Sequence, residues 1–468
     1  MKRYLVLLPL LLALSVGTLL AGHKWLDSAK DKIEITEHVL EGDPAAADVT
    51  ITYRTEDQKR QLFWDTSFSP GRAGESETDF TLSLTSRSYT QTRQNYVAIY
   101  TFGNLGYTTS VRSGWLEEND ASYPDTPILA IRAVAKRTPN GEERTETVRL
   151  ADYYEYYPLV LDVGNGYLFD IVSSLQVQQF SDYFRLKVPE EKLIEITVRK
   201  DGGGNVDYLN ININPELEVW DNLDTRGVVT DSGVYLITTS VTDGVPDGRL
   251  QCPDGPGVHF IPPVKGEPFG PYEWWDVSKV RLFYPTGDAL TIELALSQDQ
   301  TKLLLYTKEA GKLVLTILDI ETGNALQRIE LMEFDGSGGL TCLEQDDLVY
   351  IQQENAFCLI QEAGGRYETV LTGTPSEDLT RYYFYYPDYA RLAWDGQRMV
   401  LAATAEYCSF YNNNEYQIML GVWDAAGLRF LGGYDYSISR DPYSRFRLMR
   451  YSSAPEPLGI AFSGPSQK

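Results

Sequence analysis

Short runs in which apolar and polar residues alternate make up most of the chain beyond its first 44 residues. Alternation with a period of two places every second side chain on the same face of a strand. The runs are rich in Val, Ile, Thr and Tyr and are bounded by Gly, Asn, Asp or Pro. They predict strands over residues 48–53, 79–84, 96–102, 128–134 and 193–198. Because helical periodicity is scarce, the pattern predicts an all-β fold.

Two local patterns recur in the chain and indicate an internal repeat. The first is a tight turn around an aspartate, followed by a β-rich run, at Asp231, Asp299, Asp346 and Asp395. The second is a strand–turn–strand hairpin with glycine at the turn, where a positive φ is needed, over residues 198–205, 318–324, 360–366 and 422–428. Two hairpins per repeat predict a four-stranded antiparallel unit. The clearest copy runs over residues 290–331, with strands in the order 1-2-3-4.

The aspartate turn carries a resemblance to a known fold family. The segment SQDQTKL, residues 297–303, resembles the S-P-D-G-x-x-L turn of TolB-like and YVTN/WD40-type propeller blades, and residues 393–399 are similar. The dipeptide Trp423-Asp424 falls where a WD40 dipeptide ends the third strand of a blade. The resemblance implies a β-propeller of about seven four-stranded blades, in which radial stacking buries both faces of each sheet. The chain as a whole resembles a family of membrane-anchored bacterial proteins.

The N-terminal segment is separate from this pattern. Lys2 and Arg3 precede an uncharged apolar stretch, residues 5–22. As a helix this stretch would be about 27 Å long, close to the roughly 30 Å hydrocarbon core of a bilayer. Signal peptidase favours a small residue three positions before its cut, and Leu19 or Leu20 stands there. We therefore predict an uncleaved signal anchor, with a secreted protein as the alternative.

The expected domain order follows from these segments. A signal anchor or transmembrane segment covers residues 1–22, and a charged stalk covers residues 23–44. A divergent β region, made of blades or a separate β domain, covers residues 45–225. Propeller blades cover residues 226–468. The positive-inside rule places the N-terminus in the cytoplasm and the large domain outside the cell membrane.

Composition excludes several partners and cofactors. The chain has 41 basic and 66 acidic residues, a net charge of −25 at pH 7, which repels nucleic acid. Its four cysteines form no CxxC pair, so zinc and thioredoxin-like sites are excluded. Calcium is the metal best suited to the acidic turns, but Asp243, Asp247 and Asp335 offer too few oxygens to fill a calcium site alone. We predict no cofactor.

Catalytic motifs are scarce. Only three histidines occur, and His259 alone lies well inside the domain, in the strand-like segment GVHFI, where we expect a structural role. No nucleophile elbow, zinc-protease motif, P-loop or dinucleotide fingerprint is present. Paired carboxylates remain open, because propeller glycosidases use acidic residues around the central channel and sequence spacing does not show which converge.

One aromatic pattern occurs twice. The motif YYxYYP begins at Tyr153 and again at Tyr382. Alternation would send these tyrosines to both faces of a strand, where they either pack between sheets or form an exposed platform for a glycan or peptide. The candidate ligand-binding residues are Tyr153, Tyr154, Tyr156, Tyr157, Tyr382, Tyr383, Tyr385 and Tyr386.

Together these features predict an extracytoplasmic, membrane-anchored binding, sensing or scaffold protein with no evident catalytic activity. Its partner would be another protein or a cell-wall glycan. The alternative is a propeller glycoside hydrolase or lyase that uses carboxylates at the axis of the ring.

Overall fold

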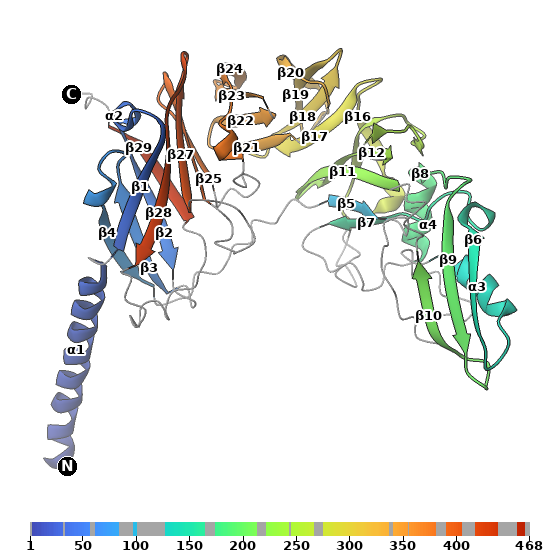
Figure 1. The fold of residues 1–468 in the computed structure, drawn as a ribbon, viewed down its shortest axis with the longest axis horizontal. Coiled ribbons are helices and arrows are strands. Elements are labelled where there is room, and N and C mark those ends of the chain that lie inside the picture. The colour runs from blue at the N-terminus through green and yellow to red at the C-terminus, as the bar shows by residue number, and fades with distance from the viewer. Residues whose placement is uncertain are drawn as a thin grey trace. The chain divides into compact units, whose positions relative to one another are not determined.

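The protein is dominated by antiparallel strands, as its computed structural model shows (Figure 1). The structure describes residues 2–30, 33–56, 61–83, 97–100, 127–163, 174–212, 221–242, 245–265, 275–336, 340–353, 355–380, 390–404, 417–438 and 456–463. The α-helices in these ranges are α1 (Lys2–Lys30), α2 (Pro44–Ala47), α3 (Ile128–Arg137), α4 (Ser174–Tyr183) and α5 (Glu377–Thr380). The predicted β-rich class is confirmed.

The chain divides into two compact units. Unit 1 comprises Met1–Tyr89 and Asp335–Lys468, and unit 2 comprises Thr90–Phe334. Unit 1 thus joins segments from the two ends of the chain. These bounds differ from the boundary expected at residues 225/226.

The described residues of unit 1 form three antiparallel sheets. The first has the order β21-β22-β23-β24 and the second β25-β26-β27-β28 with β1 added at β28. The third has the order β29-β2-β3-β4. Their strands are β1 (Ile33–Gly42), β2 (Val49–Glu56), β3 (Leu62–Phe68), β4 (Glu77–Leu82), β21 (Thr341–Gln345), β22 (Leu348–Gln353), β23 (Ala356–Ala363), β24 (Arg366–Gly373), β25 (Ala390–Trp394), β26 (Arg398–Thr404), β27 (Ile418–Asp424), β28 (Gly427–Ile438) and β29 (Glu456–Phe462).

Strands from distant parts of the sequence complete two of these sheets. Strand β1 pairs with β28 from Ile33 opposite Ile438 to Gly42 opposite Phe430. Gly42 has a φ of 78°, and a Cβ there would lie 2.0 Å from the carbonyl oxygen of Arg429. Glycine is therefore needed where β1 ends. Strand β29 pairs with β2 and becomes the first strand of its sheet.

The sheets of unit 1 pack face to face. One hydrophobic core joins the β21–β24 sheet to the β25–β28 sheet through residues such as Phe357, Leu401 and Trp423. A second core joins the opposite face of the β25–β28 sheet to the β2–β4 sheet through Val400, Ile51 and Trp64. The middle sheet is thus buried on both faces, which explains the near-continuous apolar runs of β26 and β27.

The part of unit 2 that the structure describes has two further sheets of this kind. The first has the order β11-β12-β15-β16, with β13 paired to β12, and the second has the order β17-β18-β19-β20. Their strands are β11 (Asp221–Thr230), β12 (Gly233–Thr242), β13 (Val245–Pro246), β15 (Gly257–Ile261), β16 (Arg281–Pro285), β17 (Leu290–Leu296), β18 (Lys302–Glu309), β19 (Lys312–Asp319) and β20 (Ala325–Glu333). The prediction of a four-stranded unit over residues 290–331 is confirmed, including its strand order.

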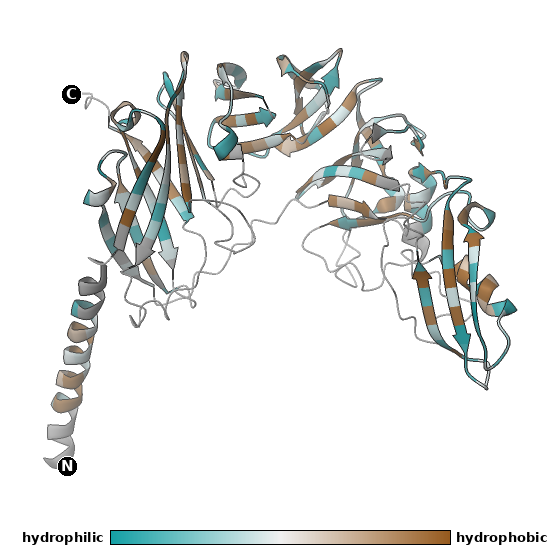
Figure 2. Ribbon diagram, in the orientation of Figure 1, coloured by the Kyte–Doolittle hydropathy of each residue, from teal (hydrophilic) through white to brown (hydrophobic). Residues whose placement is uncertain are grey.

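The remaining part of unit 2 mixes helices with short sheets. Strands β5 (Val97–Tyr100) and β7 (Val160–Val163) pair with each other, as do β8 (Arg185–Leu186) and β14 (Leu250–Gln251). A three-stranded sheet has the order β10-β9-β6, with β6 (Glu143–Arg149), β9 (Leu193–Lys200) and β10 (Val206–Asn212). Hydrophobic and hydrophilic residues alternate along β9 and β10 (Figure 2). One face of this sheet is therefore free to pack against α3.

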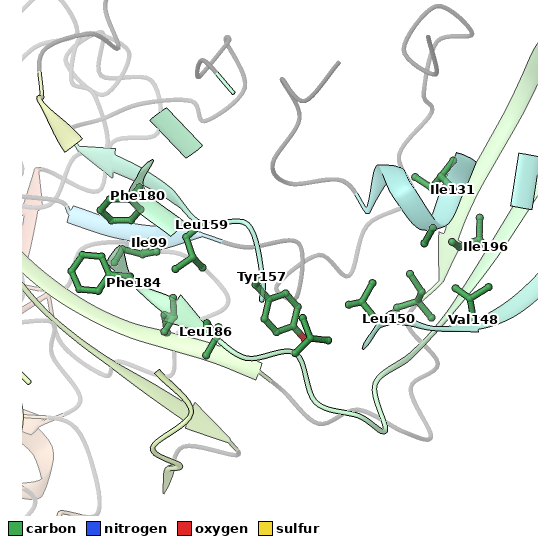
Figure 3. Close-up of a cluster of buried hydrophobic side chains, with 14 of the residues drawn as sticks. Ile99, Ile131, Val148, Leu150, Tyr157, Leu159, Phe180, Phe184, Leu186 and Ile196 are labelled. Carbon is green, nitrogen blue, oxygen red and sulfur yellow. The ribbon is translucent and has the colours of Figure 1, made fainter. Parts of the chain in front are cut away.

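A single hydrophobic core holds this mixed region to the β11–β16 sheet (Figure 3). It includes Ile131 from α3, Ile196 from β9, Phe180 from α4 and Leu236 from β12. The opposite face of the β11–β16 sheet packs on the β17–β20 sheet through a separate core that includes Val258 and Leu305. Stacked sheets with buried faces are therefore the shared organisation of both units.

Two segments differ from the sequence-based expectation. Residues 128–134 were predicted as a strand but belong to α3, whose Ala130, Ile131, Val134 and Ala135 are buried. This spacing forms one helical face, and the sheet beneath it supplies the apolar surface that the helix covers. Residues 33–42, expected within the stalk, form β1 instead, because β28 offers an open edge to pair with.

The exposed part of α1 is unusually apolar. Leu10, Leu12, Leu14 and Leu19 are 60–71% exposed. Among the described residues, no helix meets the combination of length and apolar character required to cross a membrane.

Candidate functional site

The first tyrosine motif lies next to the core of unit 2. Tyr157 is fully buried within that core, and Tyr153 and Tyr154 pack against it (Figure 3). The Tyr154 hydroxyl accepts a hydrogen bond of 2.9 Å from the Leu129 backbone N–H of α3. Burial raises the pKa of Tyr154 to about 12. Tyr156 is half-buried and forms a β-bridge with Lys187.

These positions favour a packing role for the first motif. A fully buried ring such as Tyr157 offers no area to a ligand, and the Tyr154 hydroxyl already has a partner within the fold. The second motif, with Tyr382, Tyr383, Tyr385 and Tyr386, lies outside the described residues. A platform shared by the two motifs stays a prediction.

The recurring aspartates stabilise their own turns. Asp299 accepts hydrogen bonds from Ser297 Oγ, Thr301 N and Thr301 Oγ1 at 2.7, 3.1 and 2.8 Å. These bonds, led by that from Ser297, lower the pKa of Asp299. Asp395 similarly accepts from the backbone of Gln397 and Arg398. Carboxylates used in this way hold strand connections rather than ligands.

The described aspartates considered as calcium ligands also accept hydrogen bonds within the fold. Asp247 accepts hydrogen bonds from Ser240 Oγ at 2.5 Å and Arg249 Nε at 2.7 Å. Asp335 accepts from Gln353 Nε2 at 3.2 Å, and Asp243 lies outside the described residues. Within the described ranges, no group of three or more His, Cys, Asp or Glu side chains is arranged to hold a metal ion.

Two carboxylates and one arginine converge between the first strands of neighbouring sheets in unit 2. Asp224 and Arg226 belong to β11 and Glu293 to β17. Arg226 Nη1 lies 2.9 Å from Asp224 Oδ1, and Arg226 Nε lies 3.3 Å from Glu293 Oε2. The Arg226 and Asp224 side chains are 48% and 47% exposed, whereas that of Glu293 is 25% exposed. This ion triad is therefore open to solvent on one side.

The local backbone and burial distinguish Glu293 from Asp224. A β-bulge interrupts the pairing of β17 with β18 between Thr291 and Glu293. Bulges redirect side chains and are frequent beside functional sites. Burial raises the pKa of Glu293, although its own hydrogen bond from Leu294 N and the charge of Arg226 oppose the change. Two nearby carboxylates in unlike environments are the arrangement that acid–base chemistry uses.

This triad could not be predicted from the sequence. Its members are separated by 67 residues between Arg226 and Glu293, and they match no motif. The hypothesis of acidic residues around a central channel named no residue, and the packing of the two sheets identifies which side chains meet.

A second polar cluster surrounds His259 on β15. The imidazole is 1% exposed, and its Nδ1 lies 3.1 Å from the hydroxyl of Tyr183 at the end of α4. The same hydroxyl donates to Asp254 Oδ2 at 3.0 Å. Burial lowers the pKa of His259 to about 4 and raises that of the neighbouring Cys252 to about 12. A neutral histidine with hydrogen bonds inside the fold matches the structural role expected for His259.

Asp162 on β7 is a buried carboxyl whose Oδ2 has no hydrogen-bond partner among the described residues. The residue is 8% exposed, and burial raises its pKa to about 6. Because the folded pKa exceeds the ordinary value of 3.8, the folded state binds more protons between these two pH values. Burial of the Asp162 side chain therefore costs no extra stability below pH 3.8, where the carboxyl is protonated in both states. The fold loses stability as the pH rises through 6 and the buried carboxyl ionises.

We expect Asp162→Asn to raise the free energy of unfolding by about 2 kcal/mol above pH 7, because it removes a buried charge. The gain should vanish below pH 4, where the aspartate is protonated. Urea unfolding at pH 7.5 and pH 3.5 measures both values. The exposed Asp152→Asn serves as the control and should shift neither midpoint. A destabilised Asp162→Asn at neutral pH would contradict this assignment.

Comparison with known proteins adds little to this picture. No family model matches the chain, and no curated protein matches it. Similar solved structures include a protein described as a 6-phosphogluconolactonase from Bacteroides fragilis, at 8% identity and a TM-score of 0.24, covering 85% of this chain and 84% of that one.

Two further structures match over shorter lengths. The Dos1 propeller matches at 11% identity and a TM-score of 0.25, covering 50% of this chain and 52% of that one. The GH43B protein of a Bacteroides ovatus xyloglucan locus matches at 15% identity and a TM-score of 0.23, covering 47% and 43%. The chain thus spans about half the length of these two proteins. Scores this low carry no argument about the function of this chain.

Proposed function

We propose that this chain is a membrane-anchored β-propeller that binds a partner protein or a cell-wall glycan outside the cytoplasm. The β25–β28 and β11–β16 sheets are each buried on both faces and support the propeller, since radial stacking is the arrangement that buries such faces. A closed ring of sheets also requires the ends of the chain to meet, and β29 beside β2 supplies such a meeting.

The observation that carries the proposed function is the connection between α1 and β1. Only two residues separate Lys30, the last of α1, from Ile33, the first of β1. Strand β1 is itself part of a five-stranded sheet. An anchor made of α1 would therefore hold a rigid β body at the membrane without a separate stalk. The exposed leucines of α1 support the anchor, because apolar surface of this kind needs an apolar environment.

Fractionation of cells that express the full chain tests the anchor. We expect the protein to stay in the membrane pellet at alkaline pH, with its β units open to protease from outside. Leu12→Arg should release it, since a central arginine costs about 2.5–3.5 kcal/mol on insertion scales. Lys30→Arg, which keeps the charge at the end of α1, is the control. Equal recovery of all variants in the soluble fraction would contradict the anchor.

Partner binding is tested on the detergent-extracted full chain. Mass photometry after mild cross-linking in cells should show a defined species heavier than the 52.8 kDa monomer. The binding function would be contradicted if two results were both obtained. The cross-linked cells would yield the monomer alone, and the purified protein would stay a monomer without bound glycan when cell-wall glycan is added.

The ion triad Asp224–Arg226–Glu293 favours a second candidate function, hydrolysis of a glycosidic bond. Glu293, with its raised pKa, would be the proton donor, and Asp224, which is more exposed, would be the second carboxylate. Arg226 would orient both carboxylates. The acid would then lie beside the bulge on β17, which is an edge strand of its sheet.

Release of reducing ends from cell-wall polysaccharide measures this activity. If Glu293 is the acid, Glu293→Gln should lower the rate at least about 100-fold, the usual contribution of general acid catalysis. Glu309→Gln is a matched control, because Glu309 pairs with Arg328 on the surface of the neighbouring strands. No release by the wild-type protein, or equal release by both variants, would exclude this function and leave the binding function standing.

A further inference from the structure

Helix α4 is held to the β11–β16 sheet by an unusual contact around one histidine. Tyr183, the last residue of α4, and Phe184, which follows it, both pack edge-on against the His259 ring. Their ring centroids lie 5.6 and 4.9 Å from that of His259. His259 is on the face of β15 that contributes to the core shared with α4, since Ile261 belongs to that core.

The hydrogen bonds of this contact fix the proton positions. The single Tyr183 hydroxyl proton is donated to Asp254 Oδ2. The 3.1 Å contact with His259 must therefore be a bond from Nδ1–H to the tyrosine oxygen. The chain of bonds runs from imidazole to phenol to carboxylate, and it needs a proton on Nδ1 of His259.

The loop that carries Asp254 is held in place. Gly255 N donates to Cys252 O at 3.1 Å, closing a turn around Asp254. Gly257, two residues further along, is the first residue of β15, and a Cβ there would lie 2.1 Å from the carbonyl oxygen of Tyr284. The carboxylate is thus positioned by the backbone rather than by the tyrosine it contacts.

We propose that His259, Tyr183 and Asp254 form an acid-sensitive latch, which holds the end of α4 on β15 at neutral pH and releases it in acid. The groups that face His259 are Tyr183 and Phe184 from the α4 side and Asp254 from the loop, whose Cys252 lies near Tyr183. Its neighbours in the sheet are Leu236 on β12 and Leu282 on β16, which are apolar. Asp254 is thus the one charged group facing His259 among the described residues.

The direction of the effect follows from burial. A second proton would place a charged imidazolium between two aromatic rings with 1% exposure. Burial lowers the pKa of His259 from 6.5 to about 4, so the unfolded or released state binds more protons in this range. The stabilising effect is complete above pH 6.5 and is lost as the pH falls towards 4.

Hydrogen exchange of the α4 amides in the full chain tests the latch. After correction for intrinsic rates, we expect protection of residues 178–184 to fall by about 80-fold between pH 6.5 and pH 4, the part of the roughly 300-fold ratio for 2.5 pKa units that falls in this interval. In His259→Gln this fall should be absent. His38→Gln is the matched control, because His38 lies in unit 1 and pairs with Asp435 on the surface; it should behave as the wild type.

A second measurement covers the case in which His259→Gln does not fold. The chain has only three histidines, so imidazole NMR signals of the wild type can be followed one by one. A His259 signal that titrates near pH 4, together with loss of α4 protection at the same pH, supports the latch. Titration near pH 6.5, or an identical loss of protection in His259→Gln, would overturn it.

Discussion

Removal of residues 456–468 is expected to abolish cooperative unfolding of unit 1. The deletion takes away β29, which pairs with β2 from Val49 opposite Phe462 to Arg54 opposite Glu456. It also removes Ile460 and Phe462, which pack on the core between this sheet and the β25–β28 sheet. Several backbone hydrogen bonds at about 1 kcal/mol each, with the lost apolar contacts, amount to roughly 5 kcal/mol. Domains are stable by only about 5–15 kcal/mol in total.

Thermal unfolding followed by circular dichroism measures the effect, and limited proteolysis locates it. A shorter truncation that removes residues 464–468 is the control and should unfold as the full chain does. A synthetic peptide of residues 456–463, added to the longer truncation, should restore part of the transition by pairing with β2. Unchanged unfolding of the longer truncation would show that β29 does not complete the sheet.

The repeating units of the fold were predictable because their signals are local. Asp231, Asp299, Asp346 and Asp395 each stand between the first and second strands of a sheet, as predicted. The hairpins near residues 318–324, 360–366 and 422–428 each join the third and fourth strands. The residues that determine a turn lie within a few positions of one another, so a turn can be predicted from a short stretch of sequence.

The closure of sheets by β1 and β29 was not predictable from those signals. Strand β1 has a clear alternation, IEITEHVLEG, but its partner β28 lies almost 400 residues later. Sequence alone therefore left residues 33–42 in a stalk.

Helix α3 was missed for a related reason. Its segment ILAIRAV is apolar at most positions, which fits a buried strand, and only the sheet beneath it selects the helical face.

The candidate site depends on contacts of the same long-range kind. Glu293 meets Arg226 because two sheets stack and because a bulge interrupts β17. Tyr157 was predicted as a ligand-binding residue but is buried, since its segment forms a bridge and core contacts rather than a regular strand. The chemistry of a residue could be predicted from its type, but its partners could not.

Trp423 is a large buried side chain whose place at the end of a third strand was expected from the sequence and is found in the structure. It stands at the end of β27, the third strand of its sheet, where the WD40 resemblance placed it. The ring is 1% exposed, lies edge-on to Phe357 with centroids 5.7 Å apart, and its Nε1–H donates to Thr374 O at 3.2 Å. These contacts join its own sheet to the β21–β24 sheet.

We expect Trp423→Ala to lower the free energy of unfolding of unit 1 by about 4 kcal/mol, within the range for large buried aromatic residues.

Substitution of Gly421 gives a sharper test of the same packing. A Cβ at Gly421 would lie 2.2 Å from the Trp423 ring, so Gly421→Ala should destabilise the wild type. In Trp423→Ala the same methyl group would enter the space that the indole leaves. The two substitutions should therefore be coupled by at least about 1 kcal/mol in a double-mutant cycle measured by urea unfolding. Additive effects would mean that Trp423 does not fill the space beside Gly421, and the packing between the two sheets would need another explanation.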